Sequence, residues 1–276
     1  MLISILRILR IPIRDLCSRL AVSRARRSDW NSELRARGDR STIGAYAKFV
    51  VRRFRNMLRL LRHGRADGIN GFLSGVSGVI HIGANIGQEA VEYHRLNLDV
   101  LWIEPIPSVF GRLCENIKAF PRQSAIQALI SDRDGEMFHF RVSDNGGLSS
   151  SIFDFEKHKD IWPEVEFVET LDMVGETLPS ALGRQGIAPA HFDALVLDVQ
   201  GAELLVLRGA KSCLQNFTYI KTEAADFDAY DGGCRLQELA EFLTSCGFRE
   251  VSRHCFAEHP TSGKYFDVVY RKAEVV

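Results

Sequence analysis

The sequence predicts an α/β fold in which helices cover both faces of a mainly parallel sheet, preceded by a basic helical extension. Two observations carry this prediction. Short apolar runs alternate with helical stretches from residue 76 onward, and a glycine-bracketed turn joins the first run to the first helix. Such alternation is typical of βαβ units, whose strands are parallel. At 276 residues the chain is long enough for one full-sized domain with an appendage.

Charge is divided unevenly along the chain. The formal net charge is zero, but residues 1–65 hold 17 Lys and Arg against 4 Asp and Glu, and the remaining residues hold 18 against 31. A basic arm attached to an acidic body is therefore expected. We divide the chain into a basic helical extension, residues 1–70, and an α/β domain, residues 71–276.

The extension carries two amphipathic patterns. Apolar residues step by three and four over residues 2–20, with arginines opposite, and Pro12 should kink this helix. A second basic helix is expected over residues 43–63. Three interpretations stay open: the apolar stripe packs on the α/β domain or a second copy in a homo-oligomer, it lies on an anionic membrane surface, or the basic charge binds nucleic acid. Nucleic acid is the least favoured, because no aromatic-rich strand face accompanies the charge, and we predict no such partner.

Composition points to the cytoplasm. Six cysteines show no C-x-x-C pair, which fits a reducing compartment. No run reaches the ~18 uncharged apolar residues of a membrane span, and arginines interrupt the apolar start where a secretory signal would need a clean apolar run. We therefore predict a cytoplasmic protein, peripheral at the inner face of the membrane if the extension binds lipid.

The period of the apolar residues predicts the elements of the α/β domain. Strands are expected at residues 76–82, 99–104, 125–130, 192–198, 217–223, 249–255 and 265–271. Helices are expected at residues 88–96, 108–120, 202–214 and 236–246. An extended arm is expected over residues 136–142. The loop at residues 146–151 either closes over a substrate or forms a mobile surface turn.

The turn after the first strand is the sharpest motif. The strand leads from His81 into Ile-Gly-Ala-Asn-Ile-Gly, residues 82–87, and then into a helix. Gly83 lets the backbone turn tightly, and Gly87 lets it pass close to a ligand. A ligand is expected just beyond the carboxyl end of this strand. The Gly-x-x-x-Gly spacing differs from the Gly-x-Gly-x-x-Gly of dinucleotide sites.

Acidic residues end the following strands. Glu104, followed by Pro105, lies 21 positions after Gly83, where a carboxylate can accept both hydroxyl protons of a ribose. Asp132 follows the third strand and is either an acceptor for an adenine amine or an ordinary turn former. Asp198 ends an apolar strand and is either a functional carboxylate or the N-cap of the next helix. Glu223 ends the next strand and is expected to face the same crevice.

Together these motifs resemble the FkbM family of S-adenosylmethionine-dependent methyltransferases. The matching segments follow in order at residues 82–87, 104–105, 131–135, 168–172 and 198–203, and the similarity covers about residues 79–271. The resemblance implies a Rossmann-like class I methyltransferase fold, with a mostly parallel seven-stranded sheet and an antiparallel last strand. It implies S-adenosylmethionine as cofactor, bound by His81, Gly83, Ala84, Asn85, Gly87, Glu104, Pro105 and Asp132. His81 and Gln200 stand where the family usually has acidic residues.

The resemblance also implies O-methylation of a hydroxyl on a saccharide or secondary metabolite. A hydroxyl nucleophile must lose its proton, so we expect Asp198 to act as base or to orient the hydroxyl, with Glu223 as a second candidate. These two carboxylates could instead hold a divalent metal, but the sequence shows no compact ligand cluster and no metal is predicted. Two alternatives stay open: a catalytically silent scaffold in a biosynthetic complex, and a nicotinamide-dependent oxidoreductase, which the glycine spacing disfavours.

Overall fold

The computed structural model describes residues 68–273, and residues 1–67 and 274–276 lie outside the described part. The predicted extension over residues 1–70 falls almost entirely outside it, so its helices stay predictions. The described part begins with a short 3-10 helix, η1 (Gly68–Gly75), that leads into the first strand. None of the helices in residues 68–273 combines the length and the apolar character that a membrane crossing requires.

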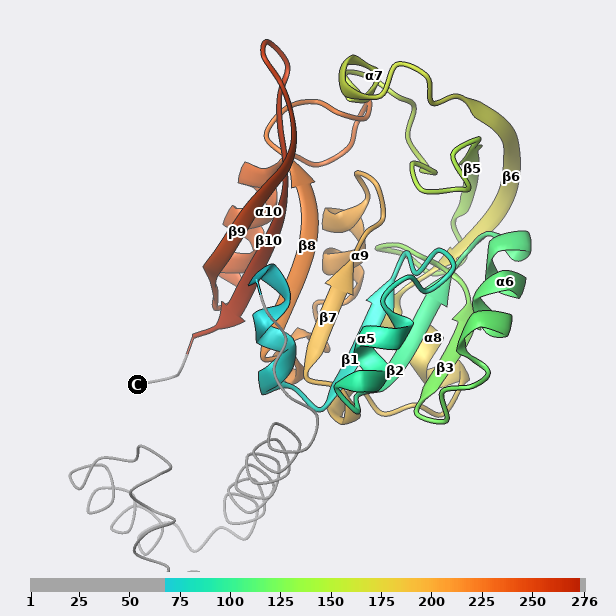
Figure 1. The fold of residues 1–276 in the computed structure, drawn as a ribbon, viewed down its shortest axis with the longest axis vertical. Helices are drawn as coiled ribbons and strands as arrows, with labels where there is room; N and C mark the ends of the chain where they lie inside the picture. The colour runs from blue at the N-terminus through green and yellow to red at the C-terminus, as the bar shows by residue number, and fades with distance from the viewer. Residues whose placement is uncertain (1–67, 274–276) are drawn as a thin grey trace, which may run out of the picture. The chain divides into compact units, whose positions relative to one another are not determined.

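In this described part, seven strands form one sheet with the order β3-β2-β1-β7-β8-β10-β9 (Figure 1). Their bounds are β1 Gly78–Ile82, β2 Asp99–Glu104, β3 Gln123–Gln127, β7 Ala194–Leu197, β8 Tyr219–Ala225, β9 Phe248–His259 and β10 Gly263–Lys272. The strands from β3 to β8 in this order pair in parallel, whereas β10 runs antiparallel to both of its neighbours. The mostly parallel sheet with a reversed last strand is thus confirmed.

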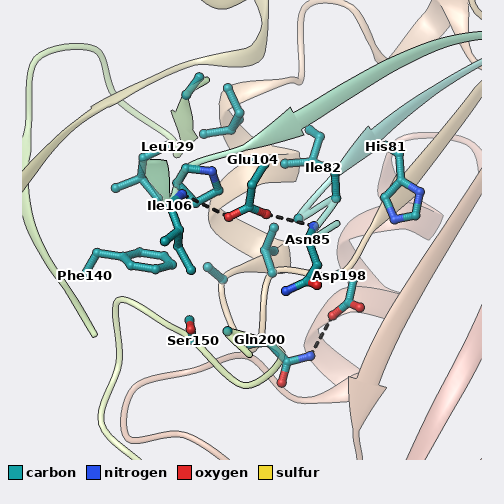
Figure 2. A pocket seen from close by; sticks show the side chains of 18 of the residues that line it. His81, Ile82, Asn85, Glu104, Ile106, Leu129, Phe140, Ser150, Asp198 and Gln200 are labelled. Atoms are coloured by element: carbon teal, nitrogen blue, oxygen red, sulfur yellow. Dashed lines mark hydrogen bonds between the residues drawn. The ribbon is translucent and has the colours of Figure 1, made fainter. Parts of the chain in front are cut away.

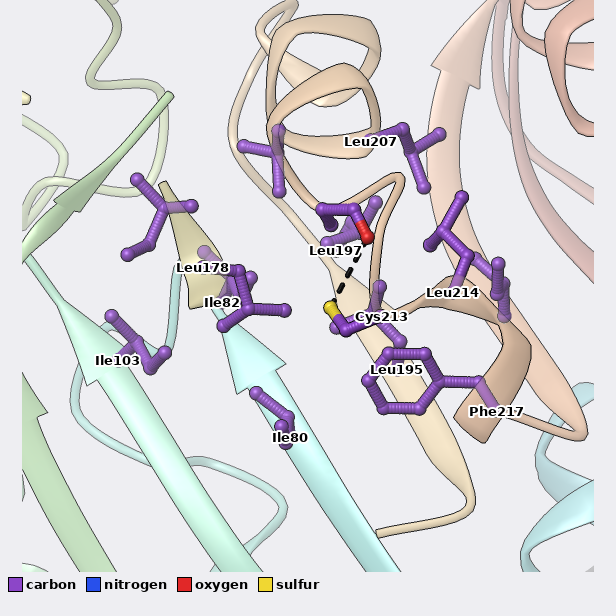
Figure 3. Packing of buried hydrophobic residues seen from close by; sticks show 14 of the residues in the cluster. Ile80, Ile82, Ile103, Leu178, Leu195, Leu197, Leu207, Cys213, Leu214 and Phe217 are labelled. Atoms are coloured by element: carbon purple, nitrogen blue, oxygen red, sulfur yellow. Dashed lines mark hydrogen bonds between the residues drawn. The ribbon is translucent and has the colours of Figure 1, made fainter. Parts of the chain in front are cut away.

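Helices cover the two faces of this sheet because its central strands β1 and β7 are buried on both sides. Every residue of β1 and β7 is buried, and successive side chains of a strand point to opposite faces. Val79 shares a core cluster with residues of α5 (Ala90–Arg95) and α6 (Pro107–Ile117). Ile80 and Ile82 belong to the opposite cluster (Figure 3), which includes residues of α8 (Leu178–Arg184), α9 (Glu203–Gly209) and α10 (Leu236–Ser245).

A second, smaller sheet stands beside the main one and differs from the prediction. Within residues 68–273 it has three strands in the order β4-β6-β5, namely β4 Leu129–Ile130, β5 Met137–Ser143 and β6 Phe167–Glu176. The single strand expected at residues 125–130 is therefore wrong. The chain leaves the main sheet after Gln127, and Leu129 and Ile130 pair with β6 instead. The extended arm expected at residues 136–142 is β5, which pairs with β6.

The remaining helices are short. The helix expected at residues 202–214 ends at Gly209, and η3 (Leu214–Asn216) follows; a Cβ on Gly209 would lie 2.1 Å from the backbone oxygen of Ser131, so α9 packs tightly there. The 3-10 helix η2 (Pro189–His191) precedes β7, and α7 (His158–Ile161) lies between β5 and β6. Helix α8 is absent from the sequence-based prediction, although Thr177 caps it and Pro179 stands in its first turn, a recognisable helix start.

Candidate active site

A cleft opens at the carboxyl ends of β1, β2, β4 and β7 (Figure 2). Its empty volume, counted out to open solvent, is about 940 Å³. The turns after β1 and β7 line one side, and residues of β5 and of the segment 147–152 line the other. A ligand site at this edge of the sheet agrees with the general rule for parallel α/β sheets.

The glycine turn after β1 is shaped by its protein neighbours. Gly83 has a φ of 79°, and a Cβ there would lie 1.7 Å from the backbone oxygen of Asp198, so only glycine lets the two turns meet. Gly87 has a φ of 75°, but a Cβ there would meet the Leu113 side chain of α6 at 2.8 Å. Gly87 does not line the cleft. The expectation that it lets the backbone approach a ligand stays a prediction, and the packing of α6 beside it gives the glycine a structural reason.

Glu104 is the anchor of the cleft. The residue is 4% exposed, and its carboxylate accepts backbone N–H groups from Asn85 at 2.8 Å and from Ile106 at 2.9 Å. Figure 2 shows both hydrogen bonds and the carboxylate between them. Burial raises the pKa of Glu104 to about 7, and these two hydrogen bonds oppose the rise. The carboxylate thus ties β2 to the glycine turn and still lines the cleft, as do Ala84 and Pro105.

Asn85 links this turn to the segment on the other side. Its φ is 43°, which asparagine tolerates better than most residues, and its Nδ2 donates to the backbone oxygen of Gly146 at 3.0 Å. Ser151 lies in the same segment and donates through Oγ to the backbone oxygen of Gln200 at 2.7 Å. Residues 149–151 are buried. Their packing contradicts the mobile surface turn considered for residues 146–151, and the segment already forms a wall of the cleft.

His81 forms an aromatic part of the lining. Its ring stacks on Trp102 with centroids 5.0 Å apart, and its Nδ1 lies 3.2 Å from the Tyr93 hydroxyl. Burial lowers the pKa of His81 to about 4, so the ring is neutral at physiological pH. Nδ1 is occupied by Tyr93, and the side chain offers the cleft a neutral ring.

An apolar chamber lies beyond Glu104. It is lined by Ile106, Ala128, Leu129, Ile130, Phe138, Phe140 and Ile152. Asp132 does not line the cleft; its carboxylate points to Arg133, 3.6 Å away. Its predicted contact with adenine is therefore not supported, and the buried Ser131 lines the cleft in its place. Phe138 and Phe140 were not predicted as site residues, because their strand belongs to the second sheet.

Asp198 and Glu223 come together through a third residue. Gln200 donates through Nε2 to Asp198 at 2.6 Å and to Glu223 at 3.1 Å. Asp198 lines the cleft, whereas Glu223 lines an adjoining hollow of about 290 Å³ that shares Gln200 with it. Burial raises the pKa of Asp198 to about 6 and that of Glu223 well above its usual range, with the neighbouring Asp198 as a further cause for Glu223. The two predicted catalytic residues are thus neighbours, but only Asp198 reaches the cleft.

Glu203 was predicted only as part of a motif, and the structure gives it a definite position. Its carboxylate accepts the backbone N–H groups of Val199 at 3.1 Å and Gly201 at 3.0 Å. These two hydrogen bonds fix the turn after β7 to the start of α9. Burial raises the pKa of Glu203 to about 7. The Asp198 carboxylate makes no side-chain cap with the helix, since the N-cap of α9 is Ala202.

Acidic groups dominate the charge of the cleft. Glu89, Glu104 and Asp198 line it, and none of the described lining residues is Lys or Arg. In residues 68–273 no three His, Cys, Asp or Glu side chains are grouped so that they could hold a metal ion. The cleft is therefore suited to a ligand that carries positive charge beside an apolar group.

Comparison with known proteins agrees with this geometry. The family model of the methyltransferase FkbM domain matches residues 81–250, which confirms the resemblance carried by the motifs. The 2-O-methyltransferase NoeI of Sinorhizobium fredii is 29% identical over 174 residues, 60% of this chain and 71% of that protein.

Solved methyltransferase structures are also similar. The N-methyltransferase NodS of Bradyrhizobium japonicum is 14% identical, with a TM-score of 0.42 over 80% of this chain and 96% of that one. The precorrin-6y C5,15-methyltransferase of Geobacter metallireducens is 13% identical, with a TM-score of 0.40 over 79% and 87% of the two chains.

Proposed function

Since this chain belongs to the methyltransferase FkbM domain family and is a methyltransferase, we propose that it transfers the methyl group of S-adenosylmethionine to a hydroxyl oxygen of a saccharide or secondary metabolite. The observation that carries the proposal is the buried carboxylate of Glu104, held at the end of β2 inside the cleft. The 2-O-methyltransferase among its relatives supports oxygen as the acceptor atom. The family match removes the nicotinamide-dependent oxidoreductase from consideration.

The residues of the cleft fit this cofactor. The Glu104 carboxylate has lone pairs beyond the two that its backbone N–H partners use, and these can accept ribose hydroxyls. The apolar chamber with Phe138 and Phe140 suits a flat, uncharged adenine ring. The described lining holds three acidic side chains and no Lys or Arg, which suits the positively charged sulfonium. His81, being neutral, adds no repulsion to such a cation.

The chain's own task in the reaction is to place and deprotonate the acceptor. S-adenosylmethionine supplies an already activated methyl group, so positioning the nucleophile can account for much of the rate, roughly 7–11 kcal/mol in favourable cases. Asp198 lines the cleft, and its pKa of about 6 leaves it ionised at neutral pH. Its carboxylate can accept a hydrogen bond from the acceptor hydroxyl and take the proton as the oxygen reacts. Glu223, outside the cleft, acts on Asp198 rather than on the acceptor.

The first experiment is calorimetric titration of the protein with S-adenosylmethionine and S-adenosylhomocysteine, with NADH as a control ligand. We expect micromolar binding of both sulfur compounds and at least 100-fold weaker binding by the Glu104→Ala variant, since a hydrogen-bonded charged group contributes several kcal/mol in a buried site. A panel of saccharides and hydroxylated metabolites is then tested with isotopically labelled methyl donor. A folded protein that binds neither sulfur compound contradicts the proposal, and binding without transfer to any acceptor favours the silent scaffold.

The basic segment, residues 1–65, supports a second part of the proposal, a peripheral contact with an anionic membrane surface that would bring the enzyme to a membrane-bound acceptor. Residues 1–65 carry an excess of 13 positive charges, and each basic residue near such a surface contributes ~1 kcal/mol to binding. Vesicle flotation with and without anionic lipid, and with residues 1–65 deleted, tests it. Vesicle binding that does not respond to salt, or equal flotation on neutral vesicles, contradicts the membrane contact. If light scattering shows a dimer that the deletion of residues 1–65 abolishes, the result favours packing of this segment against a second copy of the chain.

A further inference from the structure

Gln200 occupies an unusual position between two acidic side chains. Its Nε2 carries two hydrogens, and each has a carboxylate partner: Asp198 at 2.6 Å and Glu223 at 3.1 Å. Its Oε1 accepts a hydrogen bond from the Tyr230 hydroxyl at 2.7 Å. With Oε1 facing the Tyr230 hydroxyl, the amide nitrogen faces the two carboxyl groups. Figure 2 shows Gln200 reaching toward Asp198 from the turn after β7.

The backbone around Gln200 is held as firmly as its side chain. Its φ is 52°, a conformation that costs energy for a residue other than glycine. The backbone oxygen of Gln200 accepts from Ser151 at 2.7 Å, and Glu203 binds the N–H groups on either side of it. Gln200 is 9% exposed. A strained backbone held from three sides indicates that the position of this amide is fixed before any ligand binds.

Two carboxyl groups meet beside Gln200, where a positive or partly positive group favours their ionised forms. Nε2 of Gln200 lies 2.6 Å from an Asp198 oxygen and 3.1 Å from a Glu223 oxygen. The two oxygens are therefore separated by at most the sum of these two distances. Proteins often place a divalent cation between such oxygens, at about 2.0–2.6 Å from each. In this site the partial positive charge of an amide NH₂ group stands at that point. Gln200 therefore does with hydrogen bonds what a cation would do by coordination.

We propose that Gln200 is a positioning residue whose side-chain amide takes the place of a divalent cation between Asp198 and Glu223, so that Asp198 is held toward the acceptor without a metal. The role of Asp198 rests on the proposed function. The hydrogen-bonded bridge from Gln200 to Asp198 and Glu223 does not depend on the proposed function, because it is present in the protein without cofactor or acceptor. The proposal predicts that a carboxylate at position 200 opens a metal site.

The test is Mn²⁺ binding followed by electron paramagnetic resonance on the full-length protein. The wild type is expected to bind no Mn²⁺ at these carboxylates, and Gln200→Glu is expected to bind it at least 100-fold more tightly, because three carboxylates then converge. The matched control is Gln88→Glu, which adds the same charge to the same cleft where Gln88 is exposed and contacts Asn85. Circular dichroism verifies that each variant is folded.

Either of two results overturns the proposal. The first result is that the wild type binds Mn²⁺ tightly and that Asp198→Asn abolishes this binding. The Gln200 amide would then not exclude a cation. The other is a folded Gln200→Glu variant that binds Mn²⁺ no better than Gln88→Glu. Neither measurement uses S-adenosylmethionine, so a failed cofactor titration and a failed metal titration are separate outcomes.

A second measurement covers the case in which Gln200→Glu does not fold. The carboxyl carbon of Asp198 is titrated by ¹³C NMR in the wild type and in Gln200→Met, and is assigned by its loss in Asp198→Asn. Removing a donor to the ionised form should raise the proton affinity of Asp198 roughly tenfold, while Gln88→Met should leave it unchanged. An unchanged Asp198 titration in Gln200→Met contradicts the proposal. The other charged groups that act on Asp198 are the same in the wild type, Gln200→Met and Gln88→Met: Glu89, Glu104, Glu203, Glu223, Asp267 and Lys221.

Discussion

Glu104→Gln should flatten the pH dependence of folding stability while it abolishes cofactor binding. Glu104 is 4% exposed, and the described residues around it offer its carboxylate two backbone N–H groups but no Lys or Arg in the cleft lining. Burial therefore raises the pKa of Glu104 from 4.5 to about 7. Glutamine has a similar shape and keeps one oxygen acceptor, but it has no proton to lose.

The magnitude follows from this pKa. The folded protein binds the Glu104 proton more tightly than the unfolded chain, so the stabilisation is present in full below pH 4.5 and is lost as the pH rises through 7. One pKa unit corresponds to about 1.4 kcal/mol, which makes the loss about 3 kcal/mol for Glu104. In Glu104→Gln this contribution vanishes. The variant also loses one hydrogen-bond acceptor, at a cost of about 1–3 kcal/mol, but that cost does not depend on pH.

The assay is urea unfolding followed by circular dichroism at several pH values from 4.5 to 8, for the wild type and the variant. The difference between their free energies of unfolding should change by about 3 kcal/mol over this range, in favour of the variant at high pH. Subtraction removes the contributions of His81 and of the other buried carboxyl groups. Glu115→Gln, whose side chain is 71% exposed, controls for the substitution itself. A difference that stays constant within about 1 kcal/mol refutes the reasoning.

Three further substitutions test the site. Gly83→Ala should destabilise the protein by about 2–4 kcal/mol and abolish S-adenosylmethionine binding, because its Cβ would lie 1.7 Å from a backbone oxygen. Thermal unfolding measures the stability and calorimetry the binding. A variant as stable as the wild type would show that the turns after β1 and β7 can separate freely. Asp198→Asn should lower kcat by about 10²–10⁴-fold and remove a rise in rate near pH 6, with little change in cofactor affinity; an unchanged pH–rate profile would assign the proton to another group. Asp132→Ala should change the cofactor Kd by less than about threefold, because Asp132 lies outside the cleft; a tenfold loss in the same titration would restore its predicted contact with adenine.

Local patterns located most strands of the main sheet, although the third was placed wrongly at residues 125–130. Short apolar runs such as residues 99–104 favour buried strands, and their alternation with helices leaves few topologies. The glycine turn and Glu104 were identified for the same reason, since each is a short motif at the end of a strand. Residues 167–176 escaped prediction because five of the ten are exposed in β6 and only Gly175 is buried, so the hydrophobic pattern of this strand is weak.

The sequence by itself determined the α/β class, the alternation of strands and helices along the chain, and the position of Glu104 at the end of a buried strand. Only the tertiary structure decided which distant residues meet. It placed Phe138 and Phe140 in the cleft, left Asp132 and Gly87 outside it, and joined Asp198 to Glu223 through Gln200. The physical reason is range: periodicity and turn chemistry act between neighbours in the chain, whereas the meeting of β7, β8 and the second sheet depends on how whole elements pack.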